Sequence, residues 1–167
     1  MIPSGQHNSN DPGFSIAIRL TATDADANFR RLAYYEIDSG DVTILTEGID
    51  WDVSGLLMSD DRSRAAFQVN AGGRDRVYLF DPSDNSYAPV SGLPVGRAGL
   101  GAFSPDNRQL AMTLNTATSP SDIYTLAVDS DGLGHGVITR WTASEVAGLD
   151  VSRFVEPSLI HYPTFDS

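Results

Sequence analysis

Apolar and polar residues alternate in several short stretches of this chain, most regularly in Leu110–Leu114. These five residues read Leu-Ala-Met-Thr-Leu, so the large apolar side chains fall on one side of an extended backbone, which predicts a β-strand. A turn is expected just before this strand, because Ser104–Asn107 contains Pro, Asp and Asn. A β-rich run, Ile123–Val128, follows the polar stretch 115–122, which we predict to be a loop.

The same order of turn, strand, loop and strand occurs earlier in the chain. Residues 59–70 align with residues 104–115 at a constant offset of 45, and Arg76–Asp81 aligns with Asp122–Ala127 at an offset of 46. A third, partial copy at Tyr35–Gly40 precedes the second at an offset of 43. A period in the mid-forties with several short strands per repeat is typical of β-propeller blades. A β-sandwich with a chance similarity is the alternative.

The length of the chain limits how many blades it contains. It has 167 residues, of which 41% are apolar, and this is enough for a solid core. At about 45 residues per blade there is room for three to four blades, whereas rings typically have about 4 to 8. We therefore predict an all-β fold, a partial β-propeller of about three to four four-stranded antiparallel blades.

The remaining elements are predicted from alternation and from turn residues. Further strands are expected at Phe14–Leu20, Phe29–Ile37, Val42–Leu45, Gly55–Met58, Ala88–Val90 and Gly136–Thr142. Thr21–Asn28 is predicted to be a polar loop, and Trp51 a large packing residue between blades. Thr142–Glu145 has the pattern of a capping box and Gly148 is a good stop, which predicts one short helical turn.

The chain divides into three parts by composition. Residues 1–13 are rich in Gly, Pro, Ser and Asn, and we predict a flexible leader or linker there. Residues 14–153 contain the predicted blades. Residues 154–167 are apolar and are interrupted by Pro157 and Pro163, and we predict an exit strand there.

Composition and charge exclude several classes of function. The net charge is −11, and Arg30–Arg31 is the only basic pair, so a nucleic-acid partner is not expected. There is no Cys, which excludes disulfides and thiolate chemistry and is compatible with any compartment. No apolar run reaches membrane-spanning length and no signal peptide is visible, so no membrane partner is expected.

Histidines and glycines offer little catalytic chemistry. His7, His135 and His161 do not have the spacing of metal ligands, and each is predicted to be structural or solvated. The glycine-rich stretch Gly92–Gly101 is not followed by the Lys-Ser/Thr of a phosphate-binding loop. Its glycines are better explained by close packing of backbone near a propeller axis.

One stretch opens like a calcium loop. Asp24–Asn28 reads Asp-Ala-Asp-Ala-Asn, but Phe29 stands at the sixth position, where Gly is required. Tyr35 stands at the twelfth position, where Glu would close the site. A polar loop between strands is therefore the better interpretation.

The other carboxylates do not form a recognisable pair. We predict hairpin turns rather than ligand sets at Asp81–Asn85 and Asp129–Gly132. Glu145, Asp150 and Glu156 are dispersed, and nothing marks two of them as a general acid and base. We accordingly predict no catalytic, cofactor-binding or metal-binding residue in this chain, and no cofactor.

Five segments together resemble the second part of the propeller in prolyl oligopeptidase family serine peptidases. They are Phe29–Gly40, Leu45–Gly55, Ser119–Leu126, Arg140–Asp150 and Phe154–Asp166. Their order and spacing follow the family pattern from about residue 29 onward. The resemblance implies that the last segment leads from the propeller into an α/β-hydrolase domain, which in that family carries the catalytic Ser, Asp and His.

The chain departs from the family at its catalytic part. It contains no G-x-S-x-G segment, which an α/β-hydrolase needs to hold its nucleophile. The resemblance therefore implies a non-catalytic propeller fragment that, in a full-length enzyme, gates the access of short peptides to the hydrolase site. The alternatives are a stand-alone binding or scaffold module that assembles into an oligomer, and a small enzyme. Peptide substrate is expected as a partner only in the full-length enzyme, and the isolated chain is expected to self-associate through open blade faces.

Overall fold

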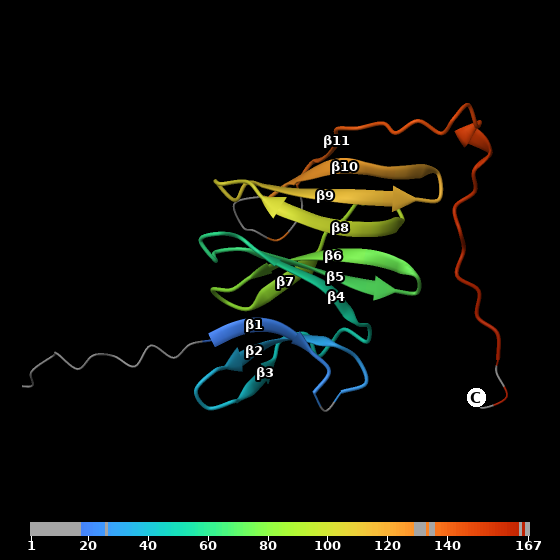
Figure 1. Ribbon diagram of the computed structural model, residues 1–167. Coiled ribbons are helices and arrows are strands. Elements are labelled where there is room, and N and C mark those ends of the chain that lie inside the picture. The colour runs from blue at the N-terminus through green and yellow to red at the C-terminus, as the bar shows by residue number, and fades with distance from the viewer. Residues whose placement is uncertain (1–17, 26, 129–132, 134–135, 164, 166–167) are drawn as a thin grey trace, which may run out of the picture.

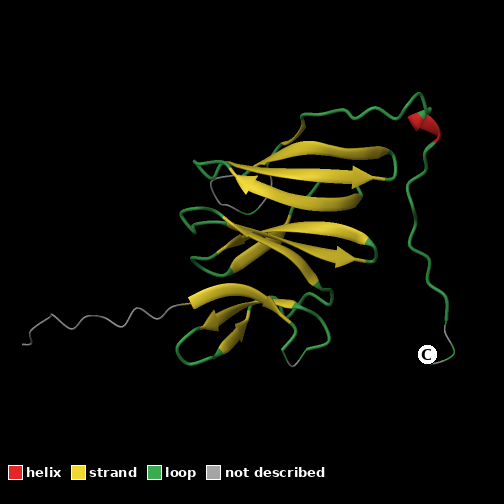
Figure 2. Cartoon of the chain, in the orientation of Figure 1, coloured by secondary structure: helices red, strands yellow, loops and turns green. Residues whose placement is uncertain are grey.

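Three antiparallel β-sheets stack in chain order (Figures 1 and 2). The computed structural model describes residues 18–25, 27–128, 133, 136–163 and 165. In Figure 1 the segment after the last strand runs along one side of the stack towards the level of the first sheet. None of the described residues forms a helix long and apolar enough to span a membrane.

The sheets have three, four and four strands, and each is formed by consecutive strands. The first sheet contains β1 (Ile18–Thr23), β2 (Arg31–Glu36) and β3 (Val42–Ile44). The second contains β4 (Val53–Met58), β5 (Ala65–Ala71), β6 (Arg74–Asp81) and β7 (Ser86–Pro89). The third contains β8 (Gly96–Phe103), β9 (Gln109–Thr116), β10 (Ser119–Ala127) and β11 (Ile138–Arg140). The predicted all-β, blade-like architecture is thus confirmed.

The alternation in the sequence determines which face of each strand is buried. In β9 the side chains of Leu110, Met112 and Leu114 are at most 2% exposed, and they pack against the second sheet. Their equivalents in β5 face the first sheet, where Phe67 is fully buried. Each blade therefore turns the same face towards the preceding blade, as expected of a stacked repeat.

Aromatic rings fill the space between the first two sheets. Phe67 and Tyr78 stack with their ring centroids 4.9 Å apart. Tyr87 meets Phe67 edge to face at 5.8 Å, and Tyr34 of the first sheet meets Phe80 in the same manner at 6.4 Å. Offset and edge-to-face contacts of this kind add roughly 0.5–1.5 kcal/mol per pair to area burial.

Glycines in β8 allow its backbone to lie close to β9. A Cβ atom on Gly96 would stand 2.1 Å from the carbonyl oxygen of Asn115, and one on Gly101 would stand 2.8 Å from that of Ala111. Both distances are shorter than a real Cβ contact. Gly96 and Gly101 therefore serve close backbone packing, as expected, and the predicted position of the stretch near a propeller axis stays a prediction.

Two predicted loops are shorter than expected. Residues 115–122 were expected to form a loop, but β9 continues to Thr116 and β10 begins at Ser119, with a bulge before Asp122. Similarly, β1 extends through Thr23 into the polar stretch 21–28 because it pairs with Arg31–Ala33 of β2. In both stretches β-branched Thr residues extend the strands, and cross-strand hydrogen bonds satisfy the backbone.

Two further predictions were wrong. Trp51, expected to pack between blades, is 43% exposed. The described residues of the expected exit strand form no strand: they run extended, with Val155 82% and Tyr162 77% exposed. By contrast, Pro89 lies in the edge strand β7, where the missing N–H group costs no ladder bond.

We predict that Phe67→Ala and Met112→Ala each lower the free energy of unfolding by ~2–5 kcal/mol, because each removes a buried side chain between sheets. Urea unfolding followed by circular dichroism measures the change. Asp60→Ala is the matched control, because Asp60 is exposed in a turn. A loss below about 0.5 kcal/mol for either core variant, the usual range for surface positions, would contradict the repeat alignment.

Candidate functional site

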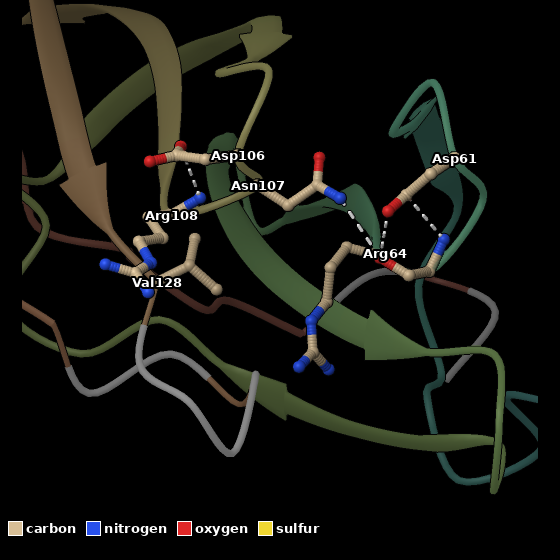
Figure 3. Close-up of a pocket in the computed structure, with 7 residues that line it drawn as sticks. Asp61, Arg64, Asp106, Asn107, Arg108 and Val128 are labelled. Atoms are coloured by element: carbon tan, nitrogen blue, oxygen red, sulfur yellow. Dashed lines mark hydrogen bonds between the residues drawn. The ribbon is translucent and has the colours of Figure 1, made fainter.

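A polar pocket lies where the turns before β5 and β9 meet, on the side of two neighbouring sheets (Figure 3). Its volume is about 530 Å³. The residues that line it are Asp61, Ser63, Arg64, Asp106, Asn107, Arg108 and Val128. It brings together carboxylates, a hydroxyl and two guanidinium groups from sequence positions about 45 residues apart. We therefore take it as the candidate functional site.

Short-range hydrogen bonds build the first turn. The Asp61 carboxylate accepts hydrogen bonds from the Ser63 backbone N–H (2.9 Å), the Ser63 hydroxyl (3.0 Å) and the Ser59 hydroxyl (2.8 Å). Ser59 Oγ also accepts from the Arg64 N–H at 3.0 Å. Arg62 sits at φ 61°, the left-handed region that closes the turn. The Ser-x-Asp-x-Ser sequence thus encodes its own geometry.

The second turn repeats the first one blade later. Ser104 Oγ donates to Asp106 Oδ1 at 2.6 Å, and Asp106 Oδ1 accepts from the Arg108 N–H at 3.1 Å. Asn107, at φ 56°, takes the place of Arg62. The Asn107 side-chain amide donates to Ser63 Oγ at 3.1 Å, which connects the two turns across the junction between sheets.

The carboxylates of these turns are firmly ionised. Hydrogen bonds from the Ser63 backbone and from the Ser59 and Ser63 hydroxyls lower the pKa of Asp61 to about 2. The Ser104 hydroxyl and the Arg108 backbone N–H lower the pKa of Asp106. A carboxylate that accepts several hydrogen bonds holds its charge because protonation would break them.

A short ion pair borders the pocket. Arg64 Nη1 lies 2.5 Å from Asp81 Oδ2, and both side chains are at most 20% exposed. The Asp81 carboxylate also accepts a hydrogen bond from the Ser83 hydroxyl at 2.6 Å. This hydrogen bond contributes most to lowering the pKa of Asp81. The predicted turn at Asp81–Asn85 is therefore present, and that it is not a ligand set stays a prediction.

This pocket has binding groups but not the machinery of covalent catalysis. A serine nucleophile needs a base that takes its proton, and an efficient general base has a pKa near neutral pH. Ser63 and Ser104 donate to carboxylates that stay ionised far below neutral pH, so these carboxylates are poor bases. Among the described residues, no three His, Cys, Asp or Glu side chains gather to hold a metal ion.

A second polar cluster surrounds Asp122 at the start of β10. Its side chain is fully buried and pairs with the guanidinium of Arg140. It accepts from the hydroxyls of Ser119 (2.8 Å), Thr142 (2.9 Å) and Ser144 (3.0 Å), and from the Ser144 N–H (2.9 Å). Burial raises the pKa of Asp122, but these hydrogen bonds together outweigh it and hold the pKa well below its usual range.

The Asp122 cluster explains why the predicted helical turn is absent. The sequence Thr142–Glu145 was expected to cap a helix, but the Thr142 hydroxyl and the Ser144 N–H and hydroxyl all bind Asp122 instead. The segment stays extended, and a single 3₁₀ turn forms later, at Val151–Arg153, capped by Asp150. Nothing local in the sequence shows that a carboxylate twenty residues away takes these groups.

The other residues considered from sequence lie apart. His7, His135 and Asp129–Gly132 lie outside the described residues. His161 is exposed in the extended segment after Phe154. Of the calcium-like stretch, Asp24 is exposed in the loop after β1.

Three scattered carboxylates remain separate. Glu145 and Glu156 are exposed, and Asp150 is occupied as the cap of the 3₁₀ turn. The predicted absence of an acid–base pair among them stays a prediction. The sequence analysis missed Asp122. The available signal was a charged residue, Asp122, next to Ile123 in a β-rich run, because an unpaired charge buried there would be costly and so must have a partner.

Replacing Asp122 should loosen the segment that follows β11. In Asp122→Asn the Arg140 ion pair is lost and one carboxylate oxygen becomes an amide that cannot accept, so residues 140–144 lose part of their anchor. We expect trypsin to cleave after Arg140 several-fold faster than in the wild type, measured by mass spectrometry of a timed digest. Asp150→Asn is the control, and equal rates for wild type and Asp122→Asn would contradict the anchoring role.

Asp61 should contribute to stability in mild acid. Its pKa in the folded protein, about 2, lies below the unfolded value of about 3.9. Its contribution is therefore complete above about pH 4 and is lost as the pH falls towards 2. The free energy of unfolding, measured with urea between pH 2 and 5, should fall less steeply with acid for Asp61→Asn than for the wild type. The difference between the two slopes should correspond to at most about one proton taken up on unfolding. Parallel curves for the two proteins would refute the assignment.

The comparisons with known proteins concern the fold. No protein-family model matches the chain, and no curated protein matches it by sequence. Prolyl oligopeptidase B from Galerina marginata, bound to a 25mer macrocyclization substrate, is similar over 78% of this chain with a TM-score of 0.62 and 13% identity. Porphyromonas gingivalis dipeptidyl peptidase 4 is similar over 78% with a TM-score of 0.54 and 20% identity. The chain spans 18% of the length of each. What it shares with these peptidases is a β-propeller-like fold.

Proposed function

We propose that this chain is the non-catalytic propeller part of a prolyl oligopeptidase-like serine peptidase, where it gates the access of peptides to a hydrolase site. The observation that carries the proposal is the likeness of its three sheets to both peptidase structures. The ordered segments from Phe29 to Asp166 support the same family independently of the fold. Such a role needs no catalytic residue in the propeller itself.

The geometry of the site supports a structural rather than a chemical role. The buried Asp122 cluster anchors the segment that leaves the last sheet, and that segment is where the family resemblance implies entry into a hydrolase domain. An anchored exit would hold the propeller in a fixed position relative to the next domain. A gate requires that fixed position, because a loosely attached propeller would exclude nothing.

A specific observation favours a second candidate, a stand-alone module that assembles into an oligomer. The first and third sheets each have one face that no other described sheet covers. Tyr35 and Val42 on the first sheet are 38% and 43% exposed, and Ile123 and Trp141 at the third are 48% and 65% exposed. Large apolar side chains gathered on open faces are typical of association surfaces.

The native gene product distinguishes the two candidates. Antibodies against this chain would isolate it from its source, and intact mass and labelling by a fluorophosphonate probe would then be measured. The peptidase proposal expects a larger, labelled polypeptide whose cleavage of peptides falls steeply as the peptide is lengthened. A product of 17.9 kDa that is not labelled would overturn it and favour the module.

We predict that residues 1–167 alone show no peptidase or esterase turnover, because the hydroxyls of Ser63 and Ser104 at the pocket turns donate to carboxylates whose pKa is lowered. Highly purified protein would be tested with a fluorophosphonate probe and a prolyl-peptide reporter. Heat-denatured protein serves as the control for adventitious labelling. Stoichiometric labelling of a serine, or turnover that co-purifies with the chain, would contradict the prediction.

A further inference from the structure

In the described part of the chain, the first sheet has no counterpart of one strand that both other sheets contain. The second and third sheets begin with an innermost strand, β4 or β8, which pairs with the next strand along the chain. Alignment of Tyr35 with Tyr78 places β2 on β6, and pairing then places β1 on β5. Among the described residues, the position beside β1 that corresponds to β4 is therefore vacant, and one edge of β1 lacks a neighbour.

The residues just ahead of β1 do not resemble an innermost strand. In the second sheet Phe67 pairs with Leu56, eleven positions before it. The residue of β1 that corresponds to Phe67 is Arg19, since each pairs with the equivalent tyrosine. Eleven positions before Arg19 stands Asn8, and residues 4–8 read Ser-Gly-Gln-His-Asn, without an apolar side chain.

The segment after β11 starts where an innermost strand would start. Between the second and third sheets, the buried carboxylate of Asp75 accepts from the N–H of Ala98 at 2.9 Å and so fixes the beginning of β8. After the third sheet, the buried carboxylate of Asp122 accepts from the N–H of Ser144, also at 2.9 Å. Ser144 thus follows Asp122 by 22 residues, much as Ala98 follows Asp75 by 23, although the repeat alignment places Asp122 on Arg76, the neighbour of Asp75.

A turn further along repeats the pattern. The sequence Asp-x-Ser-Arg occurs in Asp61–Arg64, at the turn after β4, and again in Asp150–Arg153. In both, the Asp carboxylate accepts from the Ser backbone N–H, at 2.9 Å and 3.1 Å, and from the Ser hydroxyl. The turn marks where such a strand would end, and the contact of Ser144 with Asp122 sets its register, so that Thr142–Val146 corresponds to Gly96–Leu100, the part of β8 that pairs regularly with β9.

We propose that Thr142–Val146 of one copy of this chain is the innermost strand for the first sheet of a second copy. It would run antiparallel to β1, with Val146 opposite Arg19 and Thr142 opposite Thr23, in the register that β8 keeps with β9. The four residues from Thr142 to Glu145 are exposed. Apart from Glu145 and Arg19, the two strands carry no charged side chain.

The pairing requires a second copy because the two strands lie at opposite ends of one molecule. In Figure 1 the first and third sheets are separated by the whole second sheet. Each copy has two complete sheets and contributes to a composite third. Two copies that exchange strands reciprocally would then form a ring of about six blades, within the usual range of 4 to 8. This inference does not depend on the peptidase proposal.

A disulfide test reads out the proposed register directly, because the chain contains no Cys. In the double variant Arg19→Cys/Val146→Cys the two thiols would face each other across the composite sheet, within the Cα separation that a disulfide allows. Mild oxidation should give a covalent dimer of twice 17.9 kDa. The variants Arg19→Cys and Val146→Cys, oxidised singly, are the controls and should remain mostly uncrosslinked.

Light scattering coupled to gel filtration at micromolar concentration tests the association itself. The wild type should be a dimer. The Ser144 N–H is bound to Asp122, so in an extended strand the N–H of Glu145 points to the opposite edge, and Glu145→Pro, which removes this ladder N–H, should weaken dimerisation at least about tenfold. Ser158→Pro is the matched control outside the strand and should leave the dimer intact. Circular dichroism checks that each variant folds, and if Glu145→Pro does not, the disulfide result decides.

Three outcomes would overturn the proposal. A monodisperse wild-type species of 17.9 kDa at micromolar concentration would show that no second copy is recruited. A dimer that survives Glu145→Pro and forms no disulfide in the double variant would place the contact elsewhere, on the open faces of the first and third sheets. Crosslinking in the double variant no greater than in the single variants would exclude the register.

Discussion

Each sheet has at least one apolar face that must be removed from water, and in the described part of the chain stacking on a neighbouring sheet covers it. The second sheet satisfies the requirement on both sides: Phe67 and Phe80 are buried against the first sheet, and Val77 and Leu79 against the third. The outer two sheets satisfy it on one side only. The hydrophobic effect that builds the stack thus also leaves it open at both ends, since a linear stack always has two terminal faces.

Stacking alone does not determine how the chain crosses from one sheet to the next, and side-chain carboxylates do so at every junction. Asp52 accepts from the Arg30 N–H at 2.7 Å after the first sheet. Asp75 holds the beginning of β8 after the second, and Asp122 holds residues 142–144 after the third. A backbone N–H bound to an ionised carboxylate is stronger than a neutral hydrogen bond, so a single Asp can direct each crossing.

Local patterns in the sequence determine strands and turns, and these were predicted well. Alternation in Leu110–Leu114 and the Ser-Pro-Asp-Asn turn before it lie within eleven consecutive residues, so their geometry is set mainly by neighbouring residues. Two failures lie beside Asp122. The capping pattern at Thr142–Glu145 is overridden by the contact of Asp122 with Thr142 and Ser144, about twenty residues away, and the stretch 115–122 is extended by the pairing of β9 with β10. The polar pocket likewise depends on two turns that lie 45 residues apart. The sequence repeat predicted both turns, but it did not predict the hydrogen bond between Asn107 and Ser63 that connects them.

The gating role and the strand exchange have a common requirement, which is closure of the ring. The innermost strands β4 and β8 would line the axis of a closed ring. Gly96 and Gly101 leave β8 with little side-chain bulk and let its backbone lie close to β9. Three sheets in an arc leave this axis open on one side, so they can neither enclose a passage nor exclude a large peptide. A full-length enzyme would close the ring with further blades of its own chain, and the isolated chain with a second copy. In either case the edge of β1 is where closure has to begin, because it is the innermost position that the described chain leaves unfilled.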